Sequence, residues 1–240
     1  MSAEGTIVRT PPEQAVFVDV FIRTFWISFV VTVICAALAY PVAYLLATAP
    51  ARIASLLMML VLLPFWTAVL VRTTAWMVLL QREGIVNGLL RGSGLTTEPL
   101  ALIHNRVGVY IAMTYVLLPF MILPIYAVMK GVAPAAVRAA LSLGAPPLVA
   151  FRRVYLPQTM PGVSAGCLLV FILALGYYVT PALVGGADDQ MISTFVAFNT
   201  TDTANWSLAA ALGTVLLAAT FALFALATRL GGRYRLGVLG

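Results

Sequence analysis

The chain has 240 residues, of which 62% are hydrophobic and 9% are charged, and its formal net charge is +6. Its mean hydropathy of +1.02 excludes an ordinary water-soluble domain, because too few polar residues are present to cover the surface of one. The composition instead predicts a polytopic membrane protein, and we expect an all-α helix bundle.

Five apolar stretches are long enough to cross a bilayer, whose hydrocarbon core of about 30 Å requires about 20 residues per helix. They cover residues 24–47, 53–80, 107–129, 162–184 and 207–228. We therefore expect a transmembrane domain over residues 24–228, between an N-terminal tail of residues 1–23 and a C-terminal tail of residues 229–240. The first tail lacks the apolar core and the small-residue cleavage site of a signal peptide.

The charged residues separate into two groups when alternate connections between the stretches are compared. One group contains only bases, namely Arg52, Lys130, Arg138, Arg152, Arg153, Arg229, Arg233 and Arg235. The other group contains every acid, namely Glu4, Glu13, Asp19, Glu83, Glu98, Asp188, Asp189 and Asp202. Because Lys and Arg are retained on the cytoplasmic side of a membrane, we expect the insert of residues 134–161 and the C-terminus to be cytoplasmic and the N-terminus to lie on the outer side. The net charge is then a topology signal, and we expect no nucleic-acid partner.

The second stretch contains a proline and a charge, both unusual within a membrane helix. Pro64 interrupts the helix just before Trp66 and Thr67, and such a break can expose backbone carbonyls toward a cavity. Arg72 lies nearer the outer end, where a charge is costly unless it pairs, meets water or reaches the interface. These features favour a polar cavity at the break, and if the chain forms a translocation pathway, we expect Trp66, Thr67 and Arg72 to line it; the alternatives are packing of Trp66 and snorkelling of Arg72.

A more polar insert, PAAVRAALSLGAPPLVAFRRVYLPQTMP, covers residues 134–161 between the third and fourth stretches. The positions of its prolines and of Gly144 predict two short helices on either side of a glycine. Pro134 suits the first turn of a helix, and Gly144 is placed to end that helix in a left-handed conformation.

The second helix of the insert is expected to begin at Pro146 or Pro147 and to end at Pro157. Its apolar face carries Phe151, flanked by two arginines, which is typical of a short helix that seats in a groove on a partner protein. The alternative is an amphipathic helix lying on the membrane surface. Spacing alone leaves both interpretations open.

The fourth stretch has a second polar break, at Tyr177, Tyr178 and Thr180. We predict that these three residues also line the pathway, and the alternative is an aromatic belt at the membrane interface.

Acids are absent from the predicted spans, and the outer loop after the fourth stretch carries three of them. Asp188, Asp189 and Asp202 would contact a docking protein or attract a substrate, or else they are simply solvated. His104 has no partners at ligand spacing, and both cysteines fall inside apolar runs. We expect no metal, no disulfide, no cofactor and no catalytic residue.

The string RAALSLGAPPLVAFRRVYLPQTMPG resembles the EAA motif of bacterial ABC-importer permeases, in which Glu-Ala-Ala, three residues and Gly precede a Pro-terminated second helix. The matching residues are Ala139, Ala140, Gly144, Ala145, Phe151, Leu156, Pro157, Pro161 and Gly162. Arg138 stands where the family usually has Glu. That reversal implies a different ATPase surface opposite it.

The resemblance extends to four further segments and narrows to the spermidine/putrescine-type permeases. The segments are LPFWTAVLVRTTAW from Leu63, GIVNGLL from Gly84, LPFMILPIYAVMKG from Leu118 and LALGYYVTPALVGG from Leu173. Within that group the chain is more similar to the first of the two permease subunits. Family members commonly carry a further N-terminal membrane helix without a counterpart here. The five remaining helices resemble the minimal importer core, a methionine-permease-like type I fold.

The resemblance implies a division of labour among several chains. Two permease subunits, expected to form a hetero-dimer in the inner membrane, would share one pathway; two copies of an ABC ATPase would bind below, and a periplasmic binding protein would deliver substrate. The insert, within a cytoplasmic loop of residues 130–161, would be the coupling helix on the ATPase. Its coupling residues would be Arg138, Ala139, Ala140, Gly144, Ala145, Phe151, Arg152, Arg153 and Pro157. Since the chain has no phosphate-binding P-loop motif, we expect ATP hydrolysis on a separate chain and no enzymatic activity here.

Two classes of function stay open at this point. One is a permease subunit of an ATP-driven importer, with polyamines as the leading substrates and opines, aminophosphonates or other small solutes as alternatives. The other is an ion channel or membrane scaffold without an ATPase, in which the insert rests on lipid.

Overall fold

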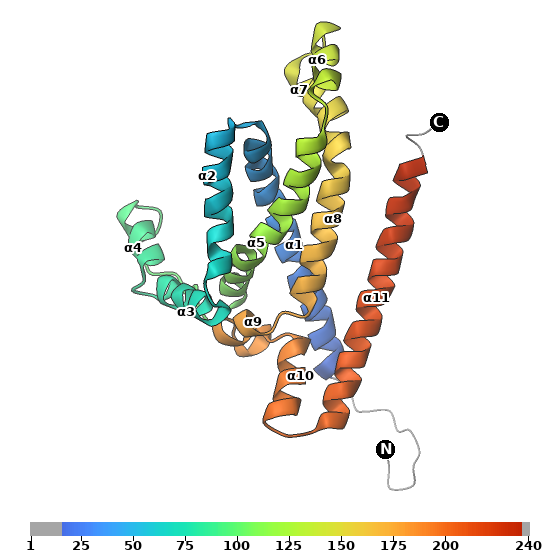
Figure 1. The fold of residues 1–240 in the computed structure, drawn as a ribbon. Coiled ribbons are helices and arrows are strands. Elements are labelled where there is room, and N and C mark those ends of the chain that lie inside the picture. Colours follow the sequence, from blue (N-terminus) through green and yellow to red (C-terminus); the bar gives the residue numbers. More distant parts are fainter. Residues whose placement is uncertain (1–15, 237–240) are drawn as a thin grey trace.

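A computed structural model describes residues 16–236, and this part of the chain contains helices and turns without a β-strand (Figure 1). The α-helices are α1 (Val16–Thr48), α2 (Ala51–Leu62), α3 (Val69–Leu80), α4 (Ile85–Gly92), α5 (Arg106–Gly131), α6 (Pro134–Ser142), α7 (Pro147–Ala150), α8 (Leu156–Leu175), α9 (Val179–Val184), α10 (Ile192–Thr201) and α11 (Trp206–Leu236). Three short helical turns of other types are η2 (Leu63–Trp66), η3 (Phe151–Tyr155) and η4 (Ala187–Asp189). The all-α prediction is confirmed.

The long helices α1, α5 and α8 pack against one another and form the core of the bundle. Their shared interior includes Ile27, Val31, Cys35, Met113, Leu117, Met121 and Val170. Two glycines allow the backbone of α8 to approach α5. A Cβ added at Gly162 would lie 2.9 Å from Val128 Cβ, and one at Gly166 would lie 2.7 Å from Met121 Sδ. Membrane helices use such small residues where they pack most closely.

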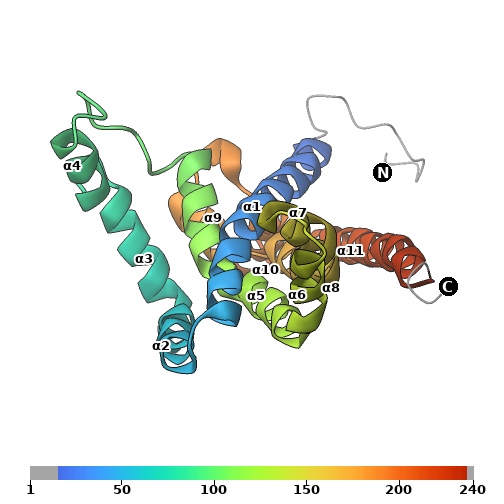
Figure 2. The ribbon, with the colours of Figure 1, turned by 90° about the horizontal axis from the view of Figure 1, so that it is seen from above.

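The remaining helices lie on two sides of this core (Figure 2). α11 packs along α10 and part of α8, whereas α3 packs on α9 and carries α4 outward on the side away from α11. In the most apolar part of each helix, 50% of α5 is buried but only 11% of α11. α11 therefore presents most of its apolar surface to the surroundings of the subunit.

Four helical segments of the described chain are long and apolar enough to cross a membrane. They are Phe17–Thr48, Arg106–Gly131, Pro147–Leu175 and Trp206–Ala225. The pair Ala51–Trp66 and Val69–Gly92 makes a fifth span if the two parts are counted together. The expected number of five spans holds on that count.

The boundaries of three expected spans require correction. The stretch 53–80 is not one straight helix, because it bends by 100° where Thr67 and Ala68 adopt extended backbone conformations. The stretch 162–184 stops being helical after Leu175, and α9 is a separate short helix. The first helix begins at Val16, within the expected N-terminal tail. The rest of that tail, residues 1–15, and residues 237–240 of the C-terminal tail lie outside the described residues.

Candidate functional site

The insert, α6 and α7, lies at one end of the bundle, which we call the insert end, and α10 lies at the opposite end, the α10 end (Figure 1). α6 begins at Pro134, as predicted, and Gly144 adopts a left-handed φ of +87°. The Gly144 N–H donates to the Leu141 carbonyl oxygen at 3.0 Å. The Ala145 N–H donates to the Ala140 carbonyl oxygen at 3.1 Å, which completes a Schellman motif. The predicted turn at Gly144 is confirmed.

The second helix of the insert does not end at Pro157, contrary to the prediction. α7 begins at Pro147 and continues through η3, a π-turn, directly into α8. Pro157 lies in the first turn of α8, and the Leu156 N–H before it donates to the Phe151 carbonyl oxygen, five residues back. Because proline has no N–H and crowds the preceding turn, a widened turn carries the helix past it. The second half of the insert is therefore a continuous extension of α8.

The predicted coupling residues differ in exposure. Arg138, Ala139, Gly144, Arg152, Arg153 and Pro157 are exposed, and Ala140, Ala145 and Phe151 are half-buried. The Phe151 ring lies against the Tyr44 ring of α1, with 5.8 Å between centroids. The most exposed large apolar side chains of the insert are Leu143, at 88%, and Leu148, at 66%. Helical spacing singles out Phe151 but does not reveal that its face is already covered by α1.

Arg72, a predicted pathway residue, closes the bend between α2 and α3. Its Nη2 donates to the carbonyl oxygen of Pro64 and, at 2.9 Å, to that of Thr67. Its Nε donates to Thr67 Oγ1 at 3.3 Å, and that hydroxyl donates to the Pro64 carbonyl oxygen at 2.9 Å. The guanidinium thereby donates hydrogen bonds to carbonyl groups that have no backbone N–H partner because the helix ends there. Trp66, at the same bend, is 90% exposed.

We expect Arg72→Ala to lower the free energy of unfolding by about 1–3 kcal/mol, since it deprives these carbonyls of a charged donor in an apolar setting. Thermal unfolding of the purified protein in detergent measures the change. Arg82→Ala, at an exposed arginine just after α3, is the matched control and should leave stability unchanged. Unchanged stability of Arg72→Ala together with lost transport would instead assign Arg72 to the pathway.

The second predicted break, at Tyr177, Tyr178 and Thr180, packs beside α3. Thr180 is buried, and its hydroxyl lies 3.2 Å from the hydroxyl of Thr73. Tyr177 is half-buried, whereas Tyr178 is exposed.

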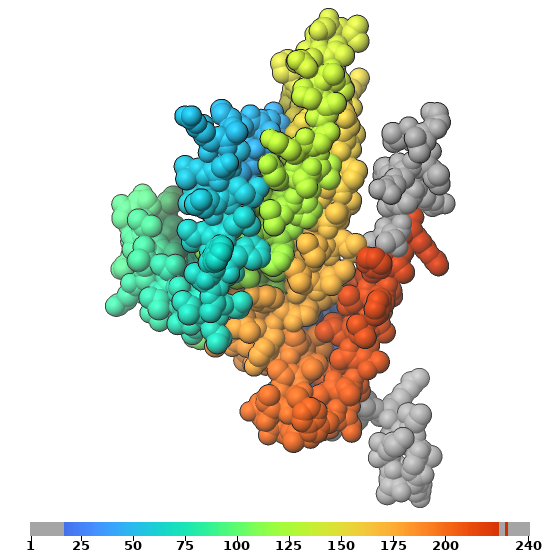
Figure 3. All heavy atoms as spheres, viewed as in Figure 1, coloured from blue at the N-terminus to red at the C-terminus, as the bar shows by residue number. Residues whose placement is uncertain are grey.

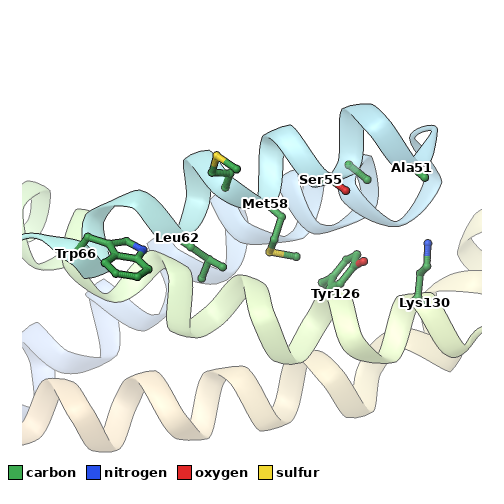
Figure 4. A pocket seen from close by; sticks show the side chains of 9 residues that line it. Ala51, Ser55, Met58, Leu62, Trp66, Tyr126 and Lys130 are labelled. Atoms are coloured by element: carbon green, nitrogen blue, oxygen red, sulfur yellow. The ribbon is translucent and has the colours of Figure 1, made fainter.

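A groove with a volume of about 480 Å³ runs between α2 and α5 (Figure 4). It is lined by Ala51, Ala54, Ser55, Met58, Met59, Leu62, Trp66, Tyr126 and Lys130. Lys130 lies at the insert end of the groove, Trp66 at the other end, and the Tyr126 ring between them. Of the six predicted pathway residues, Trp66 is the one that lines this groove. Sequence reasoning missed Tyr126 and Lys130, because their proximity to α2 depends on helix packing.

At the α10 end, an unpredicted ion pair fastens the turn after α9 to α5. Arg106 Nε lies 2.8 Å from Asp189 Oδ1, and Asp189 is buried. The His104 N–H donates to the Val184 carbonyl oxygen at 2.8 Å in the same region. Asp189 is therefore not a solvated loop residue, whereas Asp188 and Asp202 are exposed.

Several membrane-spanning helices, a helix–turn–helix insert at one end and a groove beside the core together describe a membrane transport permease. Residues 17–236 match the family model described as "Binding-protein-dependent transport system inner membrane component". This match covers nearly the whole chain, so the chain belongs to that family and is a multi-pass protein of the inner membrane.

Comparison with individual proteins shows which type of permease within the family the chain resembles. The chain is 37% identical over 194 residues to the spermidine/putrescine transport system permease protein PotB of Haemophilus influenzae, covering 80% of this chain and 68% of that protein. It is 32% identical over 200 residues to PotB of Escherichia coli, covering 83% and 73%. The chain is thus an importer permease of the PotB type, which confirms the resemblance drawn from its motifs.

The fold is similar to that of a solved transporter chain. In the crystal structure of a bacterial alginate ABC transporter in complex with an alginate pentasaccharide-bound periplasmic protein, a chain with 16% identity superposes with a TM-score of 0.74. The superposition covers 92% of this chain and 80% of that one. The predicted importer-permease fold is confirmed.

Proposed function

We propose that this chain is one of two permease subunits of an ATP-driven polyamine importer, and that its insert couples a separate ATPase to transport. The observation that carries the proposal is the insert itself. It extends beyond the ends of α1 and α2 (Figure 3) and exposes Leu143 and Leu148. Leucines held out on a polar insert are accounted for by a partner that covers them.

The partner at the insert would be the ATPase, on the cytoplasmic side of the membrane. Arg138, Arg152 and Arg153 are exposed on the same insert as the two leucines, and the insert contains no acidic residue. An ATPase cleft with apolar pockets and acidic groups at its rim would complement this surface. Arg138 in place of the family's usual Glu favours an acidic group opposite that position.

Motion of the ATPase would reach the membrane through α8. Since α7, the π-turn and α8 form one continuous helix, displacement of the insert displaces α8, which packs on α1 and α5 in the core. The α10 end is then periplasmic, and a binding protein would deliver substrate there.

The groove between α2 and α5 would form one wall of the translocation pathway, with the second permease subunit closing its open side. Trp66 and Tyr126 offer aromatic faces, which attract organic cations. Lys130 at the cytoplasmic mouth would repel a cation and favour its release. Spermidine and putrescine are the proposed substrates because the PotB relatives carry those names and match most of the chain.

We expect Leu148→Asp, combined with Leu143→Asp, to abolish co-purification of the ATPase and to stop uptake while the subunit still inserts. A carboxylate cannot be buried in an apolar pocket without a cost of several kcal/mol. Leu95→Asp is the matched control, because Leu95 is also exposed, at 75%, but lies in the turn after α4, away from the insert. Pull-down of the ATPase with each tagged variant measures the effect.

Uptake of radiolabelled spermidine and putrescine tests the substrate. Cells that express all subunits should accumulate both, and cells that lack this chain should not. Uptake that persists when the ATPase carries an inactive nucleotide site would overturn the importer and favour a channel. ATP-dependent uptake of another solute, with neither polyamine transported, would overturn the substrate alone.

A further inference from the structure

Four aromatic rings join the insert to the first helix. Phe151 and Tyr155 lie on the π-turn and stack with centroids 5.6 Å apart, at an interplanar angle of 24°. The two rings of α1 meet them edge to face. Tyr44 lies 5.8 Å from Phe151 and 5.5 Å from Tyr155, and Tyr40 lies 6.3 Å from Phe151. We call these four residues the aromatic cluster.

A directed hydrogen bond accompanies the rings. The Tyr40 and Thr159 hydroxyl oxygens lie 3.0 Å apart, and Thr159 Oγ1 also donates to the Leu156 carbonyl oxygen at 2.8 Å. The threonine hydroxyl has one proton, which it donates to the Leu156 carbonyl oxygen. The Tyr40 O–H is therefore the donor in the hydrogen bond to Thr159. Both groups of the pair therefore have partners, and α1 is tied to α8 just below the π-turn.

The two rings of α1 lie on either side of a proline, shortly before α2 begins. Pro41 stands between Tyr40 and Tyr44, and a proline within a helix removes one backbone hydrogen bond and favours bending there. The last turns of α1 end at Thr48, and α2 starts at Ala51 after two residues. α2 is the helix that forms one wall of the groove.

These contacts form an unbroken route from the insert to the groove. The π-turn carries two rings, the rings hold the end of α1, and the end of α1 leads directly into α2. Ala43 and Leu46, after Pro41, are buried in the same core as the first half of α1. A change of angle at Pro41 would therefore move the last turns of α1 together with the helices packed on them. α8 packs on α5 by backbone contacts at Gly162, so it needs no aromatic contact to hold that neighbour.

We infer that the aromatic cluster is a positioning device, which makes the end of α1, and α2 with it, move together with the insert and so opens or closes the groove. This inference rests on the proposed coupling function. Phe151 then acts inside the subunit, as the link between the insert and α1, while Leu143 and Leu148 face the ATPase.

The test uses the assembled transporter with Phe151→Leu, Tyr44→Leu and the double variant. Leucine keeps an apolar side chain at each site but removes the ring. Each variant should retain the ATPase in pull-down, and the assembled transporter should still hydrolyse ATP on its ATPase subunits. Polyamine uptake per inserted subunit should nevertheless fall roughly tenfold, within the range of energetic coupling between sites. If the two rings act through one contact, the double variant loses no more than either single variant.

Two control variants separate the cluster from general packing. Tyr44→Phe keeps the ring and should retain uptake. Phe29→Leu removes a half-exposed ring of α1 that pairs with Trp26 of the same helix, and it should also retain uptake.

A further variant tests the hydrogen bond. Tyr40→Phe removes the bond to Thr159 without loss of a ring, and a partial loss of uptake is expected.

The outcomes are distinct. Full uptake by Phe151→Leu and Tyr44→Leu, or losses that add in the double variant, would overturn the aromatic link and leave the coupling role of the insert standing. Loss of the ATPase from these ring variants would also overturn it, because Phe151 would then belong to the docking surface. Failure of the unmodified chain to retain an ATPase would instead remove the proposed function.

Discussion

Gly144→Val is expected to abolish uptake while the subunit still inserts into the membrane. Gly144 has a φ of +87°, and a β-branched residue resists this left-handed region by roughly 1–2 kcal/mol. No atom lies within 4 Å of an added Cβ, so the backbone conformation alone carries the effect. Relief of the strain would break the Schellman motif and change the angle between α6 and α7.

The matched control for this variant is Gly131→Val, at the end of α5. An added Cβ there also meets no atom within 4 Å, but its backbone lies outside the left-handed region. Gly144→Asn should retain part of the activity, because asparagine tolerates the left-handed region best after glycine. Uptake and ATPase pull-down measure both effects. Equal uptake by Gly144→Val and the unmodified chain would show that the turn can relax without loss of coupling.

The turn at Gly144 was predictable because its cause is local. Pro134 and Pro147 occupy first turns of helices, where a missing N–H costs nothing, and Gly144 occupies the position where only a left-handed residue closes the end. Such preferences depend on a few neighbouring residues and are therefore visible in one sequence. The all-α class and the number of spans follow in the same way from length and hydropathy.

The continuity of α7 with α8 was not predictable from Pro157. A proline in a helical stretch can end it, kink it or be accommodated by a wider turn, and the packing of the rest of the helix decides among these. Here Phe151 and Tyr155 gain their contacts with Tyr44 only if the helix continues. Sequence spacing identifies the apolar face that carries Phe151 but not the α1 ring that lies against it, and the role of Phe151 at an ATPase stays a prediction.

The roles of Arg72 and Asp189 depend on even longer connections. In the sequence, Arg72 is a charged residue within a predicted span. The bend that lets it donate to the Pro64 and Thr67 carbonyl oxygens is visible only in three dimensions. Asp189 reads as a loop acid, yet its partner Arg106 lies 83 residues away. In both cases the sequence identifies an unusual polar residue, and the fold supplies the group that satisfies it.

Gly162→Leu is expected to have the largest effect on the fold itself. An added Cβ would lie 3.0 Å from the Pro124 carbonyl oxygen and 3.1 Å from the Ile125 Cα, as well as 2.9 Å from Val128 Cβ. Two of these neighbours are backbone atoms of α5, which cannot move aside as a side chain can. A leucine must therefore push α8 away from α5, and overpacking of this kind costs roughly 1–3 kcal/mol or more.

A graded series of alanine variants makes this expectation sharp. Gly162→Ala should destabilise most, because backbone atoms oppose it. Gly166→Ala should destabilise less, because its nearest neighbour, at 2.7 Å, is the flexible Met121 Sδ. Gly213→Ala on α11, which meets no atom within 4 Å, should be neutral or slightly stabilising, since alanine favours a helix over glycine.

The measurement is the midpoint of thermal unfolding in detergent, together with the fraction of monodisperse protein. A series in which Gly213→Ala costs as much as Gly162→Ala would mean that the approach of α8 to α5 does not limit stability. In the expected order, the close approach of α8 to α5 limits the stability of the core formed by α1, α5 and α8.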